Sequence, residues 1–299
     1  MKKPTLREIH DAGKLLITPL AHDALSARLI ARAGFASFNI GGSSLLASRH
    51  ALPDLGLAAL GEMAAAIKDV VDAVDIPCIA DADDGYGDVK STVHTVETYH
   101  RIGVRGVLIE DQARDMKRPG ATAALAVAPI ELIEAKLRAA LSARPDRDFV
   151  VIGRTDAAGL EGVDAALRRA ERFLKLGCDG VFVAGLKRAV DFEKIGGAFK
   201  GQWNMTVMPE GGRVEWQTPQ QLRAFGYTQI VYPNSLILSV VRAVEAKLQA
   251  MQALESGTIA ALDPPEQLAI KTYEEAVRVK RWNDIESEAA RTIAAASGP

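Results

Sequence analysis

A short apolar strand followed by an amphipathic helix recurs eight times along this chain of 299 residues. Repeated strand–helix units predict a parallel sheet with helices packed on its outer face. We expect the strands at residues 15–20, 35–40, 76–81, 106–110, 149–154, 180–184, 203–208 and 229–232. Eight such units favour an α/β fold of the (β/α)8 TIM barrel type. A doubly wound open sheet is the alternative, but Gly41-Gly42 does not continue into the G-x-G-x-x-G sequence typical of that fold.

Helices are expected between the strands, and several end at a glycine. The apolar spacing predicts helices over residues 23–33, 60–74, 89–102, 130–143, 162–176, 219–225 and 236–255. Composition does not change before about residue 256, so we expect a catalytic barrel domain over 1–255 and a helical tail over 256–299. The charged, alanine-rich tail is expected to pack on the barrel or on a neighbouring subunit, because an isolated helix of this kind is marginally stable.

Composition excludes several classes of function. The chain is 48% hydrophobic and 25% charged with a net charge of −2, which is typical of a globular protein and gives no electrostatic basis for binding nucleic acid or an anionic membrane. Cys78 and Cys178 each lie in an apolar run, so they are expected to be buried core residues. The chain shows neither a signal peptide nor a long apolar run, and we expect a cytoplasmic protein.

Polar residues gather where the predicted strands end, which is where barrel enzymes carry their chemistry. The residues at these ends are Thr18, Gly41-Gly42-Ser43-Ser44, Asp81 with Asp83, Glu110-Asp111-Gln112, Arg154-Thr155-Asp156, Glu210, and Tyr232 with Asn234. Several acids and one arginine at a single barrel mouth are difficult to explain by packing alone. The pattern therefore indicates an active site.

The run Ile76–Gly87 carries the most informative acids. Side chains alternate along a strand, so Asp81 and Asp83 are expected to point the same way and Asp84 the other way. Carboxylates of this kind suit Mg²⁺ or Mn²⁺, which would offset their repulsion. A solvated acidic turn is the alternative interpretation.

Arg154 ends an otherwise apolar strand and needs an anionic partner. That partner is either a substrate carboxylate, which a guanidinium binds with two parallel hydrogen bonds, or a structural pair with Asp156 or Glu110. The turn Gly41–Ser44 offers backbone N–H groups and hydroxyls that could hold an anion, or it is an ordinary strand-to-loop turn. The histidines form no arrangement with Ser or Cys that would indicate covalent acyl catalysis.

Four motifs together resemble the isocitrate lyase/phosphoenolpyruvate mutase superfamily. They are Asp81-Ala-Asp-Asp-Gly-Tyr-Gly87, Ile109-Glu-Asp-Gln112, Gly153-Arg-Thr-Asp-Ala157 and Leu52-Pro-Asp-Leu-Gly56, and the likeness covers roughly residues 10 to 250. The resemblance is to members related to oxaloacetate decarboxylases and methylisocitrate lyases. It implies an α/β barrel whose last helix is swapped between subunits of a homotetramer built from two dimers. It also implies a Mg²⁺-bound 2-oxo or 2-hydroxy acid that reacts through an enolate.

The same resemblance implies roles for particular residues. Asp81 would bind the metal directly, while Asp54, Asp83 and Glu110 would act through water or as further ligands. Backbone amides of Gly41, Gly42 and Ser43 would hold the substrate carboxylate and the oxyanion. Arg154 would hold a carboxylate or the enolate oxygen, and Asn234 is a further candidate for substrate binding.

One loop departs from the family. Where isocitrate and methylisocitrate lyases carry a catalytic cysteine followed by glycine and histidine, this chain has Pro119-Gly120-Ala121. Decarboxylation of oxaloacetate fits this loss, because CO₂ leaves without help from a base. The alternative is a methylisocitrate- or dimethylmalate-type lyase with an acid other than cysteine. Tyr86 and Glu210 are the first candidates for this acid, followed by Lys117, Arg118 and Tyr232. A third alternative is a non-catalytic barrel that binds a metabolite.

The segment Ala113–Ala128 is rich in Ala, Arg and Gly, and its length suits a lid over the site.

Overall fold

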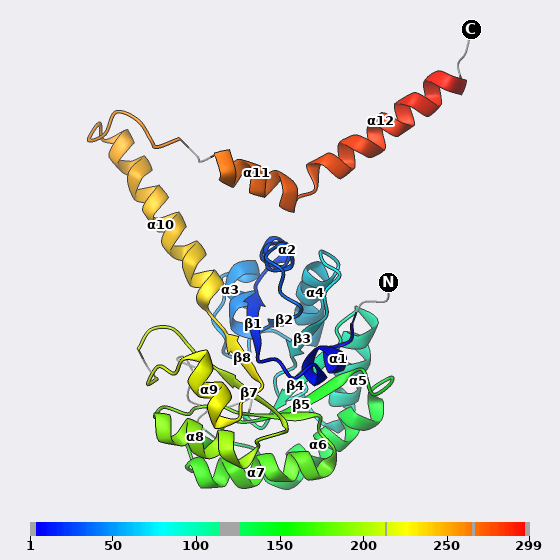
Figure 1. Cartoon of the computed structure of the whole chain (residues 1–299), viewed down its shortest axis with the longest axis vertical. Helices are drawn as coiled ribbons and strands as arrows, with labels where there is room; N and C mark the ends of the chain where they lie inside the picture. Colours follow the sequence, from blue (N-terminus) through cyan, green and yellow to red (C-terminus); the bar gives the residue numbers. More distant parts are fainter. Residues whose placement is uncertain (1–3, 114–125, 213, 265–266, 297–299) are drawn as a thin grey trace. The chain divides into compact units, whose positions relative to one another are not determined.

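The computed structural model describes residues 4–113, 126–212, 214–264 and 267–296. Eight parallel strands form a closed barrel in chain order, and β1 pairs with β8 to complete it (Figure 1). The strands are β1 (Leu16–Ala21), β2 (Phe38–Ile40), β3 (Cys78–Asp81), β4 (Gly106–Glu110), β5 (Val150–Thr155), β6 (Gly180–Val183), β7 (Trp203–Val207) and β8 (Gln229–Tyr232). The predicted eight-stranded α/β barrel is confirmed.

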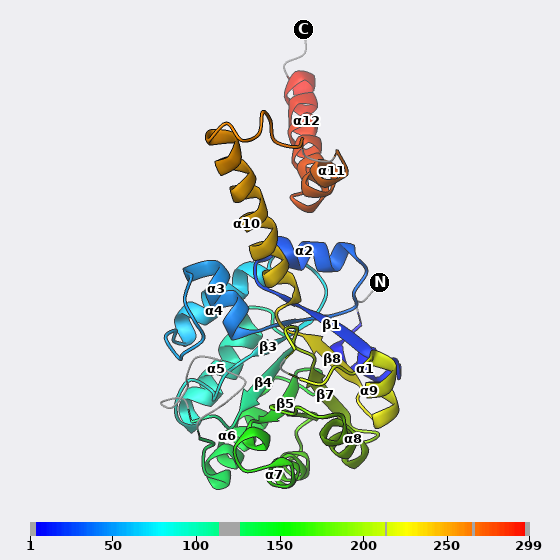
Figure 2. The same ribbon diagram turned by 90° about the vertical axis from the view of Figure 1, so that its left-hand side faces the viewer.

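Helices surround the barrel, as Figure 2 shows from a second direction. In chain order they are α1 (Leu6–Asp11), α2 (Ala24–Arg32), α3 (Gly42–His50), α4 (Leu60–Val71), α5 (Val89–Arg101), α6 (Ile130–Ala143), the 3₁₀ helix η2 (Ala157–Gly159), α7 (Val163–Leu176), α8 (Ala189–Ala198) and α9 (Pro219–Phe225). Helix α10 (Ser235–Glu255) follows β8 in the chain. The sequence patterns predict α2, α4–α7, α9 and α10 but not α1, α3 or α8. The tail forms two helices, α11 (Gln267–Ala276) and α12 (Val279–Ala296).

The strands read as continuous apolar runs because both of their faces are buried. In β4, Val107 and Ile109 pack in the cluster between strands and helices, whereas Leu108 packs in the second cluster. This second cluster also contains Phe182 and Met205 from β6 and β7, and it fills the barrel interior. Cys78 and Cys178 are buried free thiols, as predicted.

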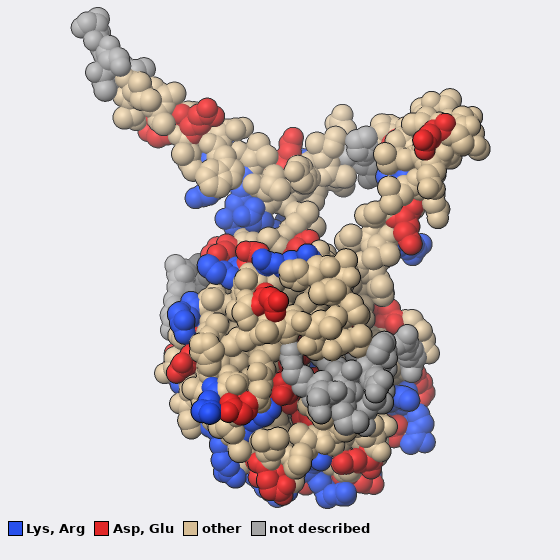
Figure 3. Space-filling view, turned by 180° about the vertical axis from the view of Figure 1, so that it is seen from behind, with Lys and Arg blue, Asp and Glu red and all other residues tan. Residues whose placement is uncertain are grey.

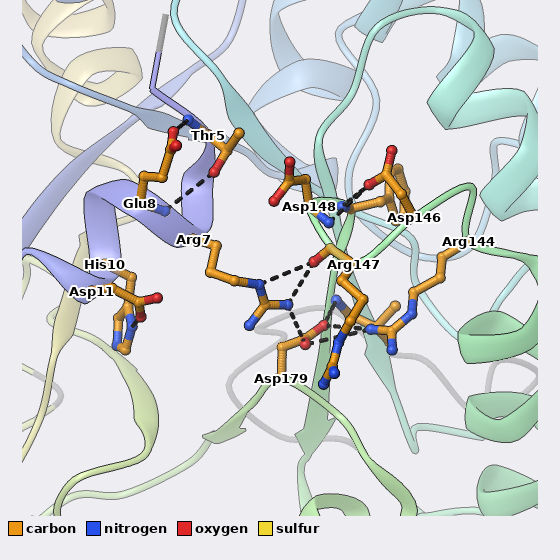
Figure 4. Close-up of polar contacts among 12 residues, drawn as sticks. Thr5, Arg7, Glu8, His10, Asp11, Arg144, Asp146, Arg147, Asp148 and Asp179 are labelled. Carbon is orange, nitrogen blue, oxygen red and sulfur yellow. Dashed lines mark hydrogen bonds and ion pairs between the residues drawn. The ribbon is translucent and has the colours of Figure 1, made fainter.

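Helix α1 is tied to the rest of the barrel through Asp179 (Figure 4). Nη2 of Arg7 lies 2.6 Å from Oδ1 of Asp179, and Nη1 of Arg144 lies 3.2 Å from its Oδ2. The same Oδ2 accepts a hydrogen bond of 2.8 Å from the backbone N–H of Val151 on β5. Leu6 packs into the barrel interior cluster. These contacts make α1 part of the scaffold, away from the strand ends that carry the acids.

Contacts between residues divide the chain into two compact units, residues 1–239 and 240–299. In the second unit, α10 carries a stripe of half-exposed apolar side chains at spacings of three and four residues: Val241, Val244, Leu248 and Met251. Among the described residues, no helix is both long and apolar enough to cross a membrane. On the face shown in Figure 3, acidic and basic side chains are interspersed over the barrel unit, in keeping with the small net charge.

Candidate active site

A cavity of about 430 Å³ opens at the carboxyl ends of the strands. Its lining comes from strand ends and following loops all around the barrel, as expected for an active site of this fold. Of the predicted site residues, the lining includes Gly41, Gly42, Ser43, Asp54, Asp81, Arg154 and Asn234. It also includes Leu20, Asn39, Leu108, Gln112, Asp156, Phe182, Met205 and Val231.

Two predicted metal ligands approach one another across Gly42. A Cβ atom on Gly42 would lie 3.8 Å from Oδ2 of Asp54 and 3.9 Å from Oδ2 of Asp81. Asp81 is the last residue of β3, while Asp54 comes from the connection between α3 and α4. The missing side chain at Gly42 thus leaves space in front of two carboxylates that come from separate parts of the chain.

Asp83 does not lie on the strand, and the predicted alternation therefore does not determine its direction. Strand β3 ends at Asp81, and Asp83 takes a left-handed backbone conformation with φ of +46°. Its N–H donates to Oδ1 of Asp81 at 3.1 Å, and its carbonyl accepts from the N–H of Glu110 at 2.8 Å. Asp83 is not among the residues that line the cavity. Its position suits support of Asp81 rather than direct contact with a ligand.

Arg154 forms both of the carboxylate pairs considered from the sequence. Its Nη1 lies 2.8 Å from Oε2 of Glu110, and its Nη2 lies 2.8 Å from Oδ1 of Asp156. The guanidinium carbon also lies 5.3 Å from the centre of the Phe182 ring. Burial acts to lower the pKa of Arg154, but the charges of Asp156, Glu110 and Asp81 outweigh it and hold the pKa well above its usual value. The guanidinium is therefore fixed in place and permanently charged at the cavity wall.

The predicted turn after β2 is in fact the start of helix α3. Gly41 is its N-cap and makes no side-chain capping bond, and α3 begins at Gly42. The first N–H groups of a helix have no partner within the helix, and the helix dipole adds partial positive charge there. Because Gly41, Gly42 and Ser43 line the cavity, this helix start can hold an anion.

Neither predicted acid lines the cavity. The hydroxyl of Tyr86 lies 3.0 Å from that of Tyr99, which in turn donates to the carbonyl oxygen of Asp81 at 3.3 Å. Burial, with the charges of neighbouring groups, holds the pKa of Tyr86 well above its usual value. Glu210 is exposed in the loop after β7, next to Pro209, which does line the cavity.

Asp111 holds together the ends of β4 and β5. It accepts hydrogen bonds from Oγ1 of Thr155 at 2.7 Å and from the N–H of Asp156 at 2.9 Å. Arg169 lies 3.3 Å from its Oδ2 and also donates to the carbonyl of Ala128. Burial raises the pKa of Asp111 to about 6, although these hydrogen bonds favour the charged form. Asp111 is therefore a scaffold residue behind Arg154.

The predicted lid lies largely outside the described residues, as do Lys117, Arg118, Pro119 and Ala121. At its two described ends, Gln112 and Val127 form an antiparallel bridge, and the N–H of Ala113 donates to the carbonyl of Ala126 at 3.0 Å.

Sequence reasoning missed Asn39 and the apolar part of the lining. Asn39 stands between Phe38 and Ile40 in an apolar run, so the pattern alone assigns it to a strand and to nothing else. A buried amide in such a run needs hydrogen-bond partners, and this is the signal that could have marked it. Leu20 and Leu108 are indistinguishable in sequence from ordinary core residues.

The donor set fits Mg²⁺. Within the part of the chain that the structure describes, no three Asp, Glu, His or Cys side chains are grouped closely enough to hold a metal ion alone. Mg²⁺ in proteins is commonly bound by one or two carboxylates, with water and substrate oxygens completing its shell. Asp81 and Asp54, which face the same space beside Gly42, provide hard oxygen ligands of this kind.

Comparison with known proteins agrees with this architecture. Residues 6–252 match the family model described as phosphoenolpyruvate phosphomutase. The 2,3-dimethylmalate lyase of Eubacterium barkeri is 32% identical over 239 residues, which cover 80% of this chain and 82% of the relative. A crystal structure of 2,3-dimethylmalate lyase matches with a TM-score of 0.81 and 26% identity, covering 95% of this chain and 96% of that one. A crystal structure of phosphonopyruvate hydrolase with oxalate and Mg²⁺ matches with a TM-score of 0.76 and 26% identity, covering 94% and 96%.

A closed barrel with carboxylates, a fixed guanidinium and a helix start at its mouth defines the general class, an α/β barrel with a charged cavity at the carboxyl ends of its strands. The chain belongs to the phosphoenolpyruvate phosphomutase family, within the isocitrate lyase/phosphoenolpyruvate mutase superfamily. The resemblance inferred from the four sequence motifs is thereby confirmed.

Proposed function

We propose that this protein is a Mg²⁺-dependent enzyme that cleaves a carbon–carbon bond in a small 2-oxo or 2-hydroxy di- or tricarboxylic acid through an enolate. The observation that carries the proposal is the convergence of Asp81, Asp54, Arg154 and the start of α3 on one cavity of about 430 Å³. Each of these groups stabilises negative charge or the ion that offsets it.

The proposed role of each residue follows from its charge. Asp81 holds the metal, and Asp54, Asp83 and Glu110 act through water or as supports. Bound Mg²⁺ supplies positive charge that offsets the developing oxyanion. The backbone amides of Gly41–Ser43 bind a substrate carboxylate, and Arg154 binds a second oxygen with its guanidinium. Asn234, which also lines the cavity, contacts the substrate. Mn²⁺ has similar ligand preferences and can replace Mg²⁺.

Oxaloacetate decarboxylation is the reaction we favour. Cleavage releases CO₂ and leaves the electron pair in the enolate of pyruvate, which then takes one proton. Pro119 and Ala121 stand where lyases of the family carry a proton-transferring cysteine and a histidine. A proline has no side-chain proton to transfer, and decarboxylation requires no base in the cleavage step.

A second candidate is lyase action on an alkyl-substituted malate. Leu20, Leu108, Phe182, Met205 and Val231 give the cavity an apolar wall, which would contact methyl groups favourably. The relative named 2,3-dimethylmalate lyase supports the same candidate. This reaction needs a general acid, for which Tyr86 and Glu210 are the candidates. Because Tyr86 lies behind Asp81 and Glu210 lies beyond Pro209, either would have to act from outside the described lining.

Product analysis separates these candidates. Purified protein with Mg²⁺ is incubated with oxaloacetate, 2,3-dimethylmalate and 2-methylisocitrate, and the 2-oxo acid and any second product are identified by NMR. Because free Mg²⁺ also decarboxylates oxaloacetate slowly, a metal-only control is subtracted. Pyruvate and CO₂ from oxaloacetate support the decarboxylase, and cleavage of a hydroxy acid supports the lyase. Absence of turnover on the whole panel would support the third alternative, a non-catalytic metabolite-binding barrel.

We also propose that the protein forms a homotetramer of two dimers in which the last barrel helix, α10, is swapped between subunits. The tail 256–299 then packs on the barrel domain 1–255 or on a neighbouring subunit. The apolar stripe on α10 supports this, because half-exposed Val and Leu side chains at heptad-like spacing are stabilised by association.

A further inference from the structure

A buried hydrogen-bond network lies beneath the cavity, inside the barrel. Nε2 of Gln229 on β8 donates to Oδ1 of Asn39 on β2 at 3.0 Å and to Oγ1 of Thr18 on β1 at 3.0 Å. Oε1 of Gln229 accepts from Nε1 of Trp203 on β7 at 2.8 Å. All four side chains are buried, and Gln229 is only 1% exposed. Thr18, expected at a strand end, lies within this network because β1 continues to Ala21.

The direction of every bond from Trp203 to Asn39 follows from chemistry. An indole N–H can only donate, so the group of Gln229 that faces Trp203 must be its carbonyl oxygen. The amide nitrogen of Gln229 then faces Asn39 and Thr18 and donates to both. Asn39 must therefore turn its carbonyl oxygen towards Gln229. The orientation of the Asn39 amide is thus determined by Trp203, a residue on another strand.

The NH₂ group of Asn39 therefore points away from Gln229. Nδ2 lies 4.0 Å from the thioether sulfur of Met205, which is only a weak acceptor. Asn39 and Met205 both line the cavity, together with apolar side chains such as Leu20 and Val231. An N–H donor in such surroundings gains more from an anionic oxygen than it would in water.

We propose that Asn39 is a specificity-determining residue that donates a hydrogen bond from Nδ2 to an oxygen of the bound carboxylic acid, and that Gln229 is the positioning residue that keeps this donor turned towards the cavity. The proposal rests on the proposed function, because it assumes an oxygen-rich anion in the cavity. It selects for a substrate with an oxo, hydroxyl or carboxylate oxygen at this position and against one with a methyl group there.

The substitution Gln229→Glu tests the positioning role without changing the cavity lining. An ionised carboxylate accepts from Trp203 and can no longer donate to Asn39. The Asn39 amide then turns over to donate to the introduced carboxylate, and it presents its carbonyl oxygen to the ligand. When the introduced carboxyl is protonated it can donate again, and the original orientation returns. Burial raises the pKa of such a group, so both states are accessible between about pH 6 and about pH 9.

The measurement is calorimetric titration of sodium oxalate in the presence of MgCl₂, because oxalate is a planar dianion shaped like the enolate of pyruvate. The dissociation constant for Gln229→Glu is expected to exceed the wild-type value by about tenfold or more at the higher pH and to approach it at the lower pH. A side chain with a purely structural role would not produce this pH-dependent ratio. Thermal unfolding of each variant is recorded alongside.

Asn39→Leu tests the donor itself, and Asn204→Leu is its matched control. Asn204 is buried on β7 between Trp203 and Met205, whose side chains pack in the barrel interior, so its own side chain faces outwards. Asn39→Leu is expected to weaken oxalate binding by about tenfold, and Asn204→Leu to leave it within about twofold. The proposal is overturned if wild type binds oxalate with Mg²⁺ and both Asn39→Leu and Gln229→Glu bind it within about twofold. A wild-type protein that does not bind oxalate at all would overturn the proposed function as well.

Discussion

Nζ of Lys136 lies 2.8 Å from the carbonyl oxygen of Asp84 and 3.0 Å from its Oδ2. Lys136 comes from α6 and is 6% exposed, so this is a buried ion pair between a helix and the turn that follows β3. In the same turn, Asp83 and Tyr86 take left-handed backbone conformations that residues other than glycine rarely adopt. The lysine thus fixes a strained turn directly after Asp81.

Replacing Lys136 by methionine is expected to destabilise the protein strongly. It removes the ammonium partner from a buried carboxylate, which typically lowers the free energy of unfolding by about 3 kcal/mol or more. Urea denaturation followed by circular dichroism measures the change. Lys194→Met is the control, because Lys194 pairs with Asp164 on the surface and both side chains are largely exposed. Equal effects of the two substitutions would show that the Lys136–Asp84 pair does not hold the turn.

Arg154→Lys is expected to lower kcat/KM by about 100-fold or more, because it keeps the charge but loses the planar fork that reaches Glu110, Asp156 and the cavity together. Steady-state kinetics on the substrate found in the product analysis measures the loss. Arg188→Lys, an exposed arginine paired with Asp191, should leave kcat/KM unchanged. Full activity of Arg154→Lys would assign Arg154 a structural role alone.

The stability contribution of Asp111 is expected to depend on pH in an unusual direction. Burial raises its pKa from 3.8 to about 6, so between these values the folded protein binds a proton that the unfolded chain releases. The contribution of Asp111 to the free energy of unfolding is therefore most favourable below about pH 4. It falls by about 3 kcal/mol in total as the pH rises through about 6. Wild type should therefore gain stability relative to Asp111→Asn as the pH is lowered from about 7 to about 4.5.

Asp191 gives the control for that measurement. The hydrogen bond from Arg188 lowers the pKa of Asp191, so its stabilisation is present at neutral pH and is lost as pH falls through the lowered value. Asp191→Asn should therefore show the opposite trend. The raised pKa of Asp111 would be contradicted if the difference in unfolding free energy between wild type and Asp111→Asn did not change with pH.

The stripe on α10 predicts association. We expect light scattering after gel filtration to give a multiple of the 32.0 kDa chain mass, four subunits in the proposed assembly. Leu248→Glu places a charge in the stripe and should yield smaller species, while the neighbouring Gln249→Glu should not. A wild-type protein of one subunit mass would refute the proposed assembly.

Much of the barrel could be predicted because its signals are local. Strands β4 and β8 agree with prediction at both ends, since each apolar run is bounded by charged or turn residues. Strand β2 is shorter than predicted, because Phe35 still belongs to the turn that ends α2. Its N–H donates a hydrogen bond to the carbonyl oxygen of Ile30. The sequence pattern does not predict helix α8, because the helix contains Gly196 and Gly197, and glycine is a poor helix former.

The site was predictable only where a residue type is unusual for its place. Asp81 and Arg154 interrupt apolar runs with charge, and both line the cavity. The direction of Asp83 depended on where β3 ends, which alternation cannot reveal. The orientation of Asn39 is set by Gln229, 190 residues away in the chain, and a contact of that kind appears only in the fold.

The most direct test of a metal-assisted anion site is oxalate titration with and without Mg²⁺, for wild type and for Asp81→Ala. We predict that wild type binds oxalate only when Mg²⁺ is present, and that Asp81→Ala, with unchanged circular dichroism, weakens this binding by about 100-fold or more. Oxalate binding that is independent of Mg²⁺, or equal in the two proteins, would contradict it.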